Sequence, residues 1–332
     1  MIRAFITGIS GQDGSYLADQ LVEERAEIHG LIRGWDTDSL ALAKRYPGIT
    51  LHDGDLADAN GVAKLIHDIE PNEIYNLAGI SSVAQSWEMP VLTGEITGIA
   101  VAGILDASLR LSEATGRSVR VLQASSSEMF GNPAASPQSE STPLSPTSPY
   151  GAAKVYAHHM VQVYRARGLA VSSCIFYNHE SPRRPETFVT RKITASAARI
   201  AAGLQDSLEL GSLDVERDWG WAPDYVDAMV RAIRHENSDD YVIATGVTHT
   251  VAHFVSVAFA AAGIADWKSH VRVNPAFVRS TEISSMLGDS SKARRILGWR
   301  PTVDFDELVE IMVRSDIESI ADAAIPAGTV ES

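Results

Sequence analysis

The first half of the chain alternates short apolar runs with longer amphipathic ones. Runs rich in β-branched and large apolar residues predict strands at 4–7, 27–32, 49–52, 74–77 and 119–123. Between them, apolar residues recur at helical spacing in 14–25, 39–46, 60–69 and 91–115. Because strands that alternate with helices form crossover units, we predict an α/β fold with a doubly wound parallel sheet.

The second half of the chain has a less regular pattern. A strand begins near Val171, a loop rich in Pro and Arg follows at 182–185, and a helix is predicted at 193–203. We therefore expect a Rossmann-type nucleotide-binding domain over residues 1–176, to which some later segments return. Residues 177–332 are expected to form mainly a smaller substrate-binding lobe.

A segment rich in Pro, Ser and Thr, residues 131–149, lies between the fifth predicted strand and a helix. Composition alone would suit a flexible linker. Loops at the carboxyl ends of such strands carry function, however, so we interpret this segment as a loop over the mouth of the site.

A glycine-rich turn follows the first predicted strand. Gly8, Gly11 and Gly14 are spaced three apart where a helix is expected to begin. Glycines let backbone N–H groups approach a pyrophosphate closely, and a helix N-terminus adds a partial positive charge. The ends of the third and fourth strands, at 55–56 and 77–81, meet the same edge of the sheet. A dinucleotide site is therefore favoured over a purely structural turn.

The end of the second strand indicates which dinucleotide binds. An acidic residue there bonds the ribose 2′-hydroxyl of NAD, whereas a basic one accommodates the 2′-phosphate of NADP. Arg33 stands at this position, which favours NADP. Asp36 and Asp38 follow closely enough to reach a ribose, so NAD stays open as the alternative.

Tyr150 and Lys154 form the centre of the predicted catalytic group. They are four residues apart at a predicted helix start and so share one helix face. A free phenol, with a pKa of about 10, is a poor base at neutral pH, but an adjacent ammonium favours the phenolate. Ser126 ends the fifth strand, where its hydroxyl can bond the oxygen that Tyr150 deprotonates. The sequence therefore predicts hydride chemistry with a tyrosine base.

Glu128 adds a second acid or base beside this group. A plain dehydrogenase or 4-epimerase has no proton to remove from the carbon beside the new ketone. A carboxylate two residues beyond Ser126, on the same side of an extended strand end, is placed to do so. Glu128 therefore favours dehydration, the alternative being an exposed loop glutamate without a role.

Several segments resemble the GDP-mannose 4,6-dehydratases, a family of extended short-chain dehydrogenases/reductases. They are residues 6–17, 123–131, 148–154, 176–184, 188–192 and 217–220, and the likeness runs from about residue 2 to 315. The resemblance implies that Tyr150 takes the proton of the C4 hydroxyl while hydride passes to NADP. Glu128 would then remove the C5 proton and help expel the C6 hydroxyl as water, before hydride returns to C6. Ser126 stands where the family commonly has threonine.

The motifs and the resemblance together predict the members of the site. The catalytic set is Ser126, Glu128, Tyr150 and Lys154. The set for NADP is Gly8, Ser10, Gly11, Gln12, Asp13, Gly14, Arg33, Asp55, Leu56, Leu77, Ala78, Gly79, Ser81, Tyr150, Lys154, His179 and Arg184. The set for the GDP-sugar, expected to be GDP-mannose, is Ser82, Ser126, Glu128, Asn178, Lys192, Arg217, Arg279 and Glu282.

The chain departs from the family pattern at a few positions. The segment 33–36, Arg-Gly-Trp-Asp, replaces a double arginine and Ser-rich stretch that helps bind the 2′-phosphate and contacts a neighbouring subunit. Both the cofactor preference and tetramer formation therefore stay open. Pro185 stands where glycine is usual, and Trp221 where histidine is frequent, and either change can reshape the sugar pocket.

The charge of the chain is strongly negative, at −14, which disfavours a nucleic-acid surface. A local exception lies between residues 183 and 217, where arginine forks would suit a diphosphate. Its basic residues are Arg183, Arg184, Arg191, Lys192, Arg199 and Arg217. Arg199 has no support from the resemblance and is the weakest candidate.

Neither a disulfide nor a metal site is expected. Cys174 is the single cysteine and lies in a strand-like run, so we interpret it as a small core residue. His249 and His253 have helical spacing but lack carboxylate or cysteine companions. His158 and His159 are adjacent, and adjacent helix residues point apart.

The chain is expected to be cytoplasmic, without a membrane partner. Its apolar stretches are interrupted by Gly, Ser, Arg or Asp before 18 residues, and Met1 leads directly into a strand rather than a signal peptide. Symmetric assembly is common for such enzymes. We therefore expect a homodimer or homotetramer, whose dimer axis by analogy lies at the helices 91–115 and 150–167.

Other functions remain possible at this stage. One is the same dehydration on a related GDP-sugar, such as a GDP-manno-heptose. Another is a GDP-sugar epimerase or 4-keto reductase, which Glu128 argues against. A nucleotide-sensing module without catalysis would be expected to lose Tyr150 or Lys154, and the chain retains both.

Overall fold

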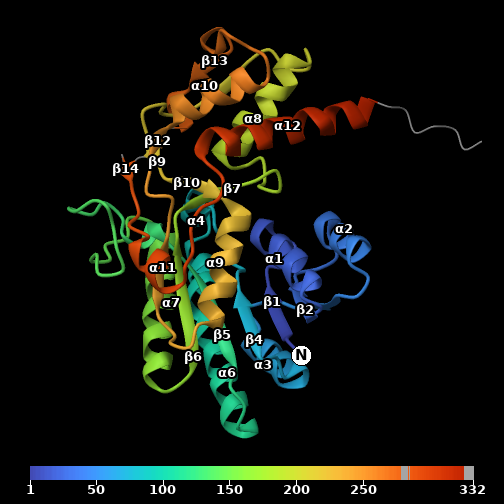
Figure 1. The fold of residues 1–332 in the computed structure, drawn as a ribbon, viewed down its shortest axis with the longest axis vertical. Coiled ribbons are helices and arrows are strands. Elements are labelled where there is room, and N and C mark those ends of the chain that lie inside the picture. Colours follow the sequence, from blue (N-terminus) through green and yellow to red (C-terminus); the bar gives the residue numbers. More distant parts are fainter. Residues whose placement is uncertain (278–282, 284, 325–332) are drawn as a thin grey trace, which may run out of the picture.

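The computed structural model describes residues 1–277, 283 and 285–324. Its central feature is a seven-stranded sheet in the order β11-β6-β5-β4-β1-β2-β3 (Figure 1), in which all neighbouring strands are parallel. Its strands are β1 (Arg3–Thr7), β2 (Glu27–Ile32), β3 (Thr50–Asp53), β4 (Glu73–Asn76), β5 (Arg120–Ser126), β6 (Ala170–Phe176) and β11 (Asp240–Ile243). The predicted α/β fold with a doubly wound sheet is confirmed.

Helices cover both faces of this sheet because its strands are apolar on both sides. Phe5 and Ile6 are fully buried in opposite clusters, as are Ile74 and Tyr75. One face is covered by α1 (Gln12–Glu23) and α9 (Ala222–Arg234), the other by α3 (Ala59–Ile69), α6 (Ala100–Thr115) and α7 (Pro149–Ala166). Cys174 is fully buried in the first cluster, as its sequence context predicted.

The predicted helix at 91–115 is interrupted. It consists of α5 (Pro90–Gly94), a π-helical segment (Glu95–Ile99) and α6. The wider π turn brings Thr97 toward the end of β4, where its hydroxyl accepts a hydrogen bond of 3.0 Å from the Ile80 amide. The irregularity therefore helps to shape the edge of the sheet at which the predicted site lies.

The stretch Pro90–Thr115 also meets the length and composition of a membrane-spanning helix. Polar interruptions were expected to prevent this, and by composition that expectation is wrong for this stretch. More than half of its most apolar window, 56%, is buried inside the protein. Packing of α6 against α3 and α7 explains the apolar composition without a membrane.

A second lobe stands at the carboxyl edge of the sheet, at the top of Figure 1. Its core joins α8 (Val189–Ala201), α10 (Val251–Ala261) and α12 (Phe305–Ala324) through side chains such as Ile193, Phe254 and Met312. Its short strands are β7 (Asn178–Glu180) with β10 (Trp219–Trp221), β9 (Glu216–Arg217) with β12 (His249–Thr250) and β14 (Ser285–Met286), and β8 (Leu208–Leu210) with β13 (Val271–Val273). The chain returns from this lobe to the main sheet through α9 and β11.

Candidate active site

The glycine turn has the geometry that a dinucleotide requires. Gly8 has a φ of +71°, which L side chains rarely adopt. A Cβ at Gly14 would lie 2.2 Å from the Gly8 carbonyl oxygen, so the turn closes only around glycine. Helix α1 begins directly after Gly11, which provides no side-chain cap. The first amides of α1 are therefore available to an anion.

A buried hydrogen-bond network fixes the neighbouring strand ends. The Thr7 hydroxyl accepts bonds of 3.1 Å from the amides of Leu77 and Ala78 and donates one of 2.7 Å to Asn76. Asn76 in turn donates to Gln123 on β5 at 2.7 Å. Thr7, Asn76 and Gln123 were not among the predicted site residues, although a polar residue ending each of two apolar strands was a usable signal.

The predicted cofactor residues lie along the carboxyl ends of four strands. Ser10 to Gly14 follow β1, Arg33 follows β2, Asp55 and Leu56 follow β3, and Leu77 to Ser81 follow β4. Arg33 is exposed, whereas Asp36 caps helix α2 (Thr37–Arg45) by accepting a bond of 2.8 Å from the Ser39 amide. The nearer of the two aspartates considered for an NAD ribose is thus already engaged.

Asp13 and His179, 166 positions apart in the chain, meet at 2.9 Å. The other imidazole nitrogen of His179 lies 2.8 Å from the Tyr177 carbonyl oxygen. Burial opposes charge on both side chains. The electrostatic attraction and hydrogen bond between them nevertheless lower the pKa of Asp13 and raise that of His179. This pair joins the glycine turn to β7, which carries the predicted substrate residue Asn178 in the next lobe.

The four predicted catalytic residues come from neighbouring elements at the end of β5. Ser126 ends β5, Glu128 lies in a 3-10 turn (Ser127–Met129), and Tyr150 and Lys154 lie in the first turns of α7. The Ser126 hydroxyl lies close enough to the Tyr150 phenol to lower its pKa, and it accepts a hydrogen bond of 3.2 Å from the Glu128 amide. A Cβ at Gly151 would lie 2.6 Å from the Glu128 carbonyl oxygen, so only glycine lets α7 approach this turn so closely.

Burial dominates the electrostatics of Tyr150. It raises the pKa of the phenol to about 12, against a lowering by the nearby Ser126 hydroxyl. The charge of Glu128 raises this pKa further, whereas that of Arg184 lowers it. The Tyr150 phenol, the Glu128 carboxylate and the Arg184 guanidinium therefore lie close enough for their charges to influence one another.

Lys154 makes its hydrogen bond with the backbone of β5, a partner that the sequence did not predict. Its ammonium donates a hydrogen bond of 2.6 Å to the Ala124 carbonyl oxygen and lies 5.8 Å from the centre of the Tyr150 ring. Burial lowers the pKa of Lys154 to about 8, although the charge of Asp13 opposes this. The ammonium is thus held by the backbone of β5, while Ser126 is the neighbour that lowers the pKa of the phenol.

The basic region divides into two groups of residues. Arg183 binds Asp19 on α1 at 2.7 Å, Arg191 pairs with Asp316 on α12, and Arg199 pairs with Glu186 at 2.7 Å. These pairs explain part of the basic run without a substrate. The residues left as candidates for a diphosphate are Arg184, Lys192 and Arg217.

The remaining substrate candidates are placed as follows. Lys192 donates to the Glu209 carbonyl oxygen at 2.7 Å, and Arg217 to that of Ile283 at 2.8 Å. Ser82 caps helix α4 (Val83–Glu88) by accepting a bond of 3.2 Å from the Gln85 amide. Arg279 and Glu282 lie outside the described residues.

Trp221 and Pro185 depart from the family pattern near the site, and they lie on different elements. Trp221 packs toward Tyr16 of α1, with ring centres 6.1 Å apart. Pro185 lies in the loop before α8, where its carbonyl oxygen accepts a bond of 3.0 Å from the Phe188 amide. Trp221 therefore contacts α1, the helix that follows the glycine turn. Pro185 shapes the loop that carries Arg184.

The loop at 131–149 is anchored rather than loosely attached. Gln138 is buried and accepts a hydrogen bond of 2.8 Å from the Tyr177 hydroxyl, and its backbone pairs with residues 287 and 289. Glu140 accepts a bond of 2.8 Å from the Val242 amide on β11. These contacts make the loop a fixed wall beside β6 and β11 and not a flexible linker.

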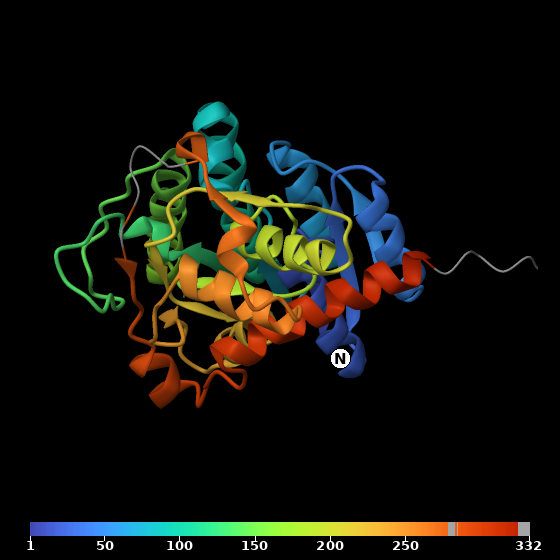
Figure 2. The ribbon, with the colours of Figure 1, turned by 90° about the horizontal axis from the view of Figure 1, so that it is seen from above.

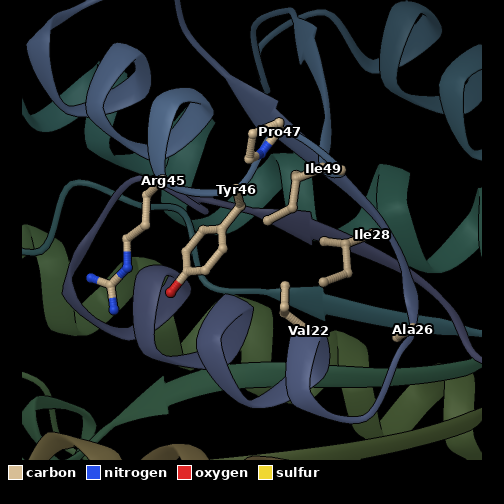
Figure 3. A pocket seen from close by; sticks show the side chains of 8 residues that line it. Val22, Ala26, Ile28, Arg45, Tyr46, Pro47 and Ile49 are labelled. Atoms are coloured by element: carbon tan, nitrogen blue, oxygen red, sulfur yellow. The ribbon is translucent and has the colours of Figure 1, made fainter.

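Histidines do not form a metal centre in the part of the chain that the structure describes. His249 and His253 lie 3.1 Å apart, and the His249 ring stacks on Phe305. They line a hollow in the second lobe of about 510 Å³. A second hollow, of about 340 Å³, is lined by Tyr46 and Val22 at the amino ends of β2 and β3 (Figure 3). Neither hollow is lined by a predicted catalytic residue.

Comparisons with known proteins agree with this arrangement. The model of the family described as GDP-mannose 4,6 dehydratase matches residues 5–312. GDP-mannose 4,6 dehydratase 1 of Arabidopsis thaliana is 45% identical over 325 residues, which cover 95% of this chain and 90% of that protein. The GDP-mannose 4,6 dehydratase of Homo sapiens is 41% identical, with 95% and 91% covered. The solved UDP-glucose 4-epimerase of Thermus thermophilus, a complex with NAD, has a TM-score of 0.81 at 25% identity and covers 95% of this chain and 99% of its own.

Proposed function

Because the chain belongs to the GDP-mannose 4,6-dehydratase family, we propose that it removes water from GDP-mannose. The product is GDP-4-keto-6-deoxymannose, and the enzyme is a nucleotide-sugar lyase. The observation that carries this proposal is the placement of Glu128 beside Ser126 and Tyr150, where its amide bonds the Ser126 hydroxyl and its charge reaches the Tyr150 phenol. An epimerase of the same fold needs the serine and the tyrosine but has no use for the added carboxylate.

A nicotinamide dinucleotide fits the residues at the glycine turn. The turn leaves no room for side chains at Gly8 and Gly14, and the first amides of α1 have no side-chain cap. The similar Thermus epimerase is described with NAD bound. Arg184 Nε is buried and makes no hydrogen bond within the described residues, only an ion pair of 3.4 Å with Glu180. A polar group of the ligand can therefore complete its coordination.

The residues divide the reaction into proton steps. Tyr150 takes the proton of the C4 hydroxyl, and Ser126 holds the same oxygen. The C4 ketone acidifies the C5 hydrogen, which Glu128 removes and delivers to the departing C6 hydroxyl. When bound, the dinucleotide would supply the hydride acceptor for C4 and the hydride donor for C6. The proton that Tyr150 took from the C4 hydroxyl, or its equivalent from solvent, returns to C5, so no net oxidation results. Lys154, whose ammonium bonds the Ala124 carbonyl oxygen of β5, would hold the ribose of the dinucleotide.

We propose NADP as the dinucleotide, because Arg33 follows β2 and Asp36 is engaged in capping α2. Replacing Arg33 by Asp is expected to raise the Kd for NADP by at least about tenfold, since a charge-assisted hydrogen bond to the 2′-phosphate is lost. The Kd for NAD should change little. Titration of both dinucleotides measures this, with Lys44→Gln, an exposed basic residue in the last turn of α2, as the control. An unchanged Kd for NADP in Arg33→Asp would contradict the assignment.

Assembly and location are proposed from the surface and the composition. Exposed apolar side chains on α5, the π-helical segment and α7, including Val91, Ile99 and Val163, support a symmetric homodimer with a homotetramer as the larger form. We propose a cytoplasmic enzyme without nucleic-acid or membrane partners. The net charge of −14 supports the absence of nucleic acid.

The central test uses purified protein, bound NADP and GDP-mannose without added reductant. The expected product is lighter than the substrate by one water, with no net consumption of NADPH. A product isomeric with GDP-mannose would indicate an epimerase instead. If GDP-mannose is inert and a GDP-manno-heptose loses water, the chemistry stands and the sugar is different.

A further inference from the structure

The loop that carries Arg184, residues 181–188, is fastened to the cofactor domain at its start. Arg183 donates to the Asp19 carboxylate at 2.7 Å and to the Ser15 hydroxyl at 3.1 Å, and its guanidinium lies 3.8 Å from the centre of the Tyr16 ring. All three partners are on α1, the helix that opens at the glycine turn. This side of the loop is therefore fixed relative to the dinucleotide turn.

The same loop is fastened to the C-terminal helix by a second arginine. Arg191, in the first turns of α8, forms an ion pair with Asp316 of α12, and its Nε donates a hydrogen bond of 3.1 Å to the Pro182 carbonyl oxygen. The side chains of Arg191 and Asp316 are only 13% and 6% exposed. Figures 1 and 2 show α12 running along α8 over this part of the molecule. One buried guanidinium thus joins α12 to the backbone of the loop.

Arg184 follows directly after the two attachment points of the loop, Pro182 and Arg183. Its guanidinium stacks 3.6 Å from the centre of the Phe188 ring and pairs with Glu180 at 3.4 Å. Its charge reaches both Asp13 of the glycine turn and the Tyr150 phenol. A shift of the loop backbone at Pro182 would therefore move a guanidinium whose charge reaches both groups.

We propose that Asp316 is a positioning residue for the dinucleotide site, acting through Arg191 on the loop that holds Arg184. The inference rests on the proposed function. A buried ion pair alone is weak evidence of stabilisation, because apolar side chains of similar size often replace it without loss. The planar fork of arginine offers more here, since it binds the carboxylate and the Pro182 carbonyl at the same time.

The decisive variant is Arg191→Lys, which retains the positive charge for Asp316 but has no Nε–H for Pro182. We expect its thermal midpoint to stay near that of the wild type while its Kd for NADPH rises by about tenfold. Direct titration of NADPH binding, followed by protein fluorescence, gives the Kd without relying on turnover. A purely structural ion pair would leave this Kd unchanged, and that result would overturn the proposal.

A second variant and a control complete the test. Asp316→Asn removes the charge that orients Arg191 and is expected to raise the Kd for NADPH by a similar factor, with a lowered thermal midpoint. Glu186→Gln breaks the exposed pair with Arg199 on the same loop and helix, whose side chains are 48% and 40% exposed, and should leave the Kd unchanged. Equal effects in all three variants would overturn the specific role of Asp316.

Failure of the proposed function would be seen separately, as wild-type protein that binds NADPH but does not dehydrate GDP-mannose.

Discussion

Replacing Glu128 by Gln is expected to stop dehydration while leaving the oxidation at C4 possible. The variant keeps the size of the side chain and the Ser126 contact, which uses the backbone amide of residue 128. It removes the only carboxylate that we assign to the C5 proton, and a general base contributes about 10²- to 10⁴-fold to a rate. We therefore expect the rate of water loss to fall by about 1,000-fold.

The same substitution acts on the phenol in the opposite direction. The negative charge of Glu128 raises the pKa of Tyr150, so the neutral glutamine makes the phenol easier to ionise. The 4-keto sugar that still carries its C6 hydroxyl should consequently accumulate to the level of the enzyme present. Mass spectrometry of rapidly quenched single turnovers distinguishes this species, two hydrogens lighter than GDP-mannose, from the dehydrated product.

Glu140→Gln provides the matched control. This glutamate is also partly buried, and burial raises the pKa of its carboxyl, but it accepts a bond from Val242 on β11 and lies in the anchored loop. Its glutamine variant should dehydrate GDP-mannose at close to the wild-type rate. Full dehydration by Glu128→Gln would remove the basis for assigning C5 deprotonation to this residue.

The sequence predicted the elements that local pattern and chain order determine. Alternating apolar and amphipathic runs located the strands from β1 to β5 to within a few residues, because a parallel sheet buried on both faces requires continuous apolar strands. The glycine turn was equally readable, since Gly8 and Gly14 satisfy steric demands that no other residue meets. Helix α8 was placed correctly but begins at Val189, earlier than predicted.

Features that depend on long-range contact were not predictable in this way. The Asp13–His179 pair was anticipated only as two separate cofactor residues, because nothing in local spacing brings positions 13 and 179 together. Within the basic run between 183 and 217, the resemblance singled out Arg184, Lys192 and Arg217. The carboxylates that engage Arg183 and Arg191, which are Asp19 of α1 and Asp316 of α12, came only from the fold. A charge pattern shows where arginines are, but not which are already paired.

The position of Lys154 shows the same limit inside the catalytic group. Helical spacing placed it on the face of Tyr150, which the structure bears out, and an ammonium so close was expected to act on the phenol. The strand end offered a nearer acceptor, the Ala124 carbonyl oxygen. Backbone acceptors at a strand end cannot be located from residue spacing, so the hydrogen-bond partner of Lys154 came only from the fold.

Replacing Lys154 by Met is expected to make the protein more stable and inactive at the same time. The ammonium is buried, with only 5% of the residue exposed, and burial lowers its pKa from 10.5 to about 8. A shift of this size corresponds to about 3 kcal/mol that the folded state loses by holding the charge. Methionine removes that cost but leaves the Ala124 carbonyl oxygen without its donor, which costs about 1 kcal/mol. The net gain in the free energy of unfolding is about 2 kcal/mol at pH 7, whereas the rate of dehydration should fall by at least about 100-fold.

The pH dependence identifies the source of this gain. Below pH 8 the ammonium is charged in both states, so the cost is fully present and the variant has its greatest advantage. Between pH 8 and 10.5 the unfolded wild-type chain binds more protons than the folded one, and the stability contributed by this group therefore rises with pH. The advantage of Lys154→Met should shrink across this interval and disappear above it. Urea unfolding of both proteins from pH 7 to about 10.5 measures the difference, and a constant difference would show that the lysine is not buried in charged form.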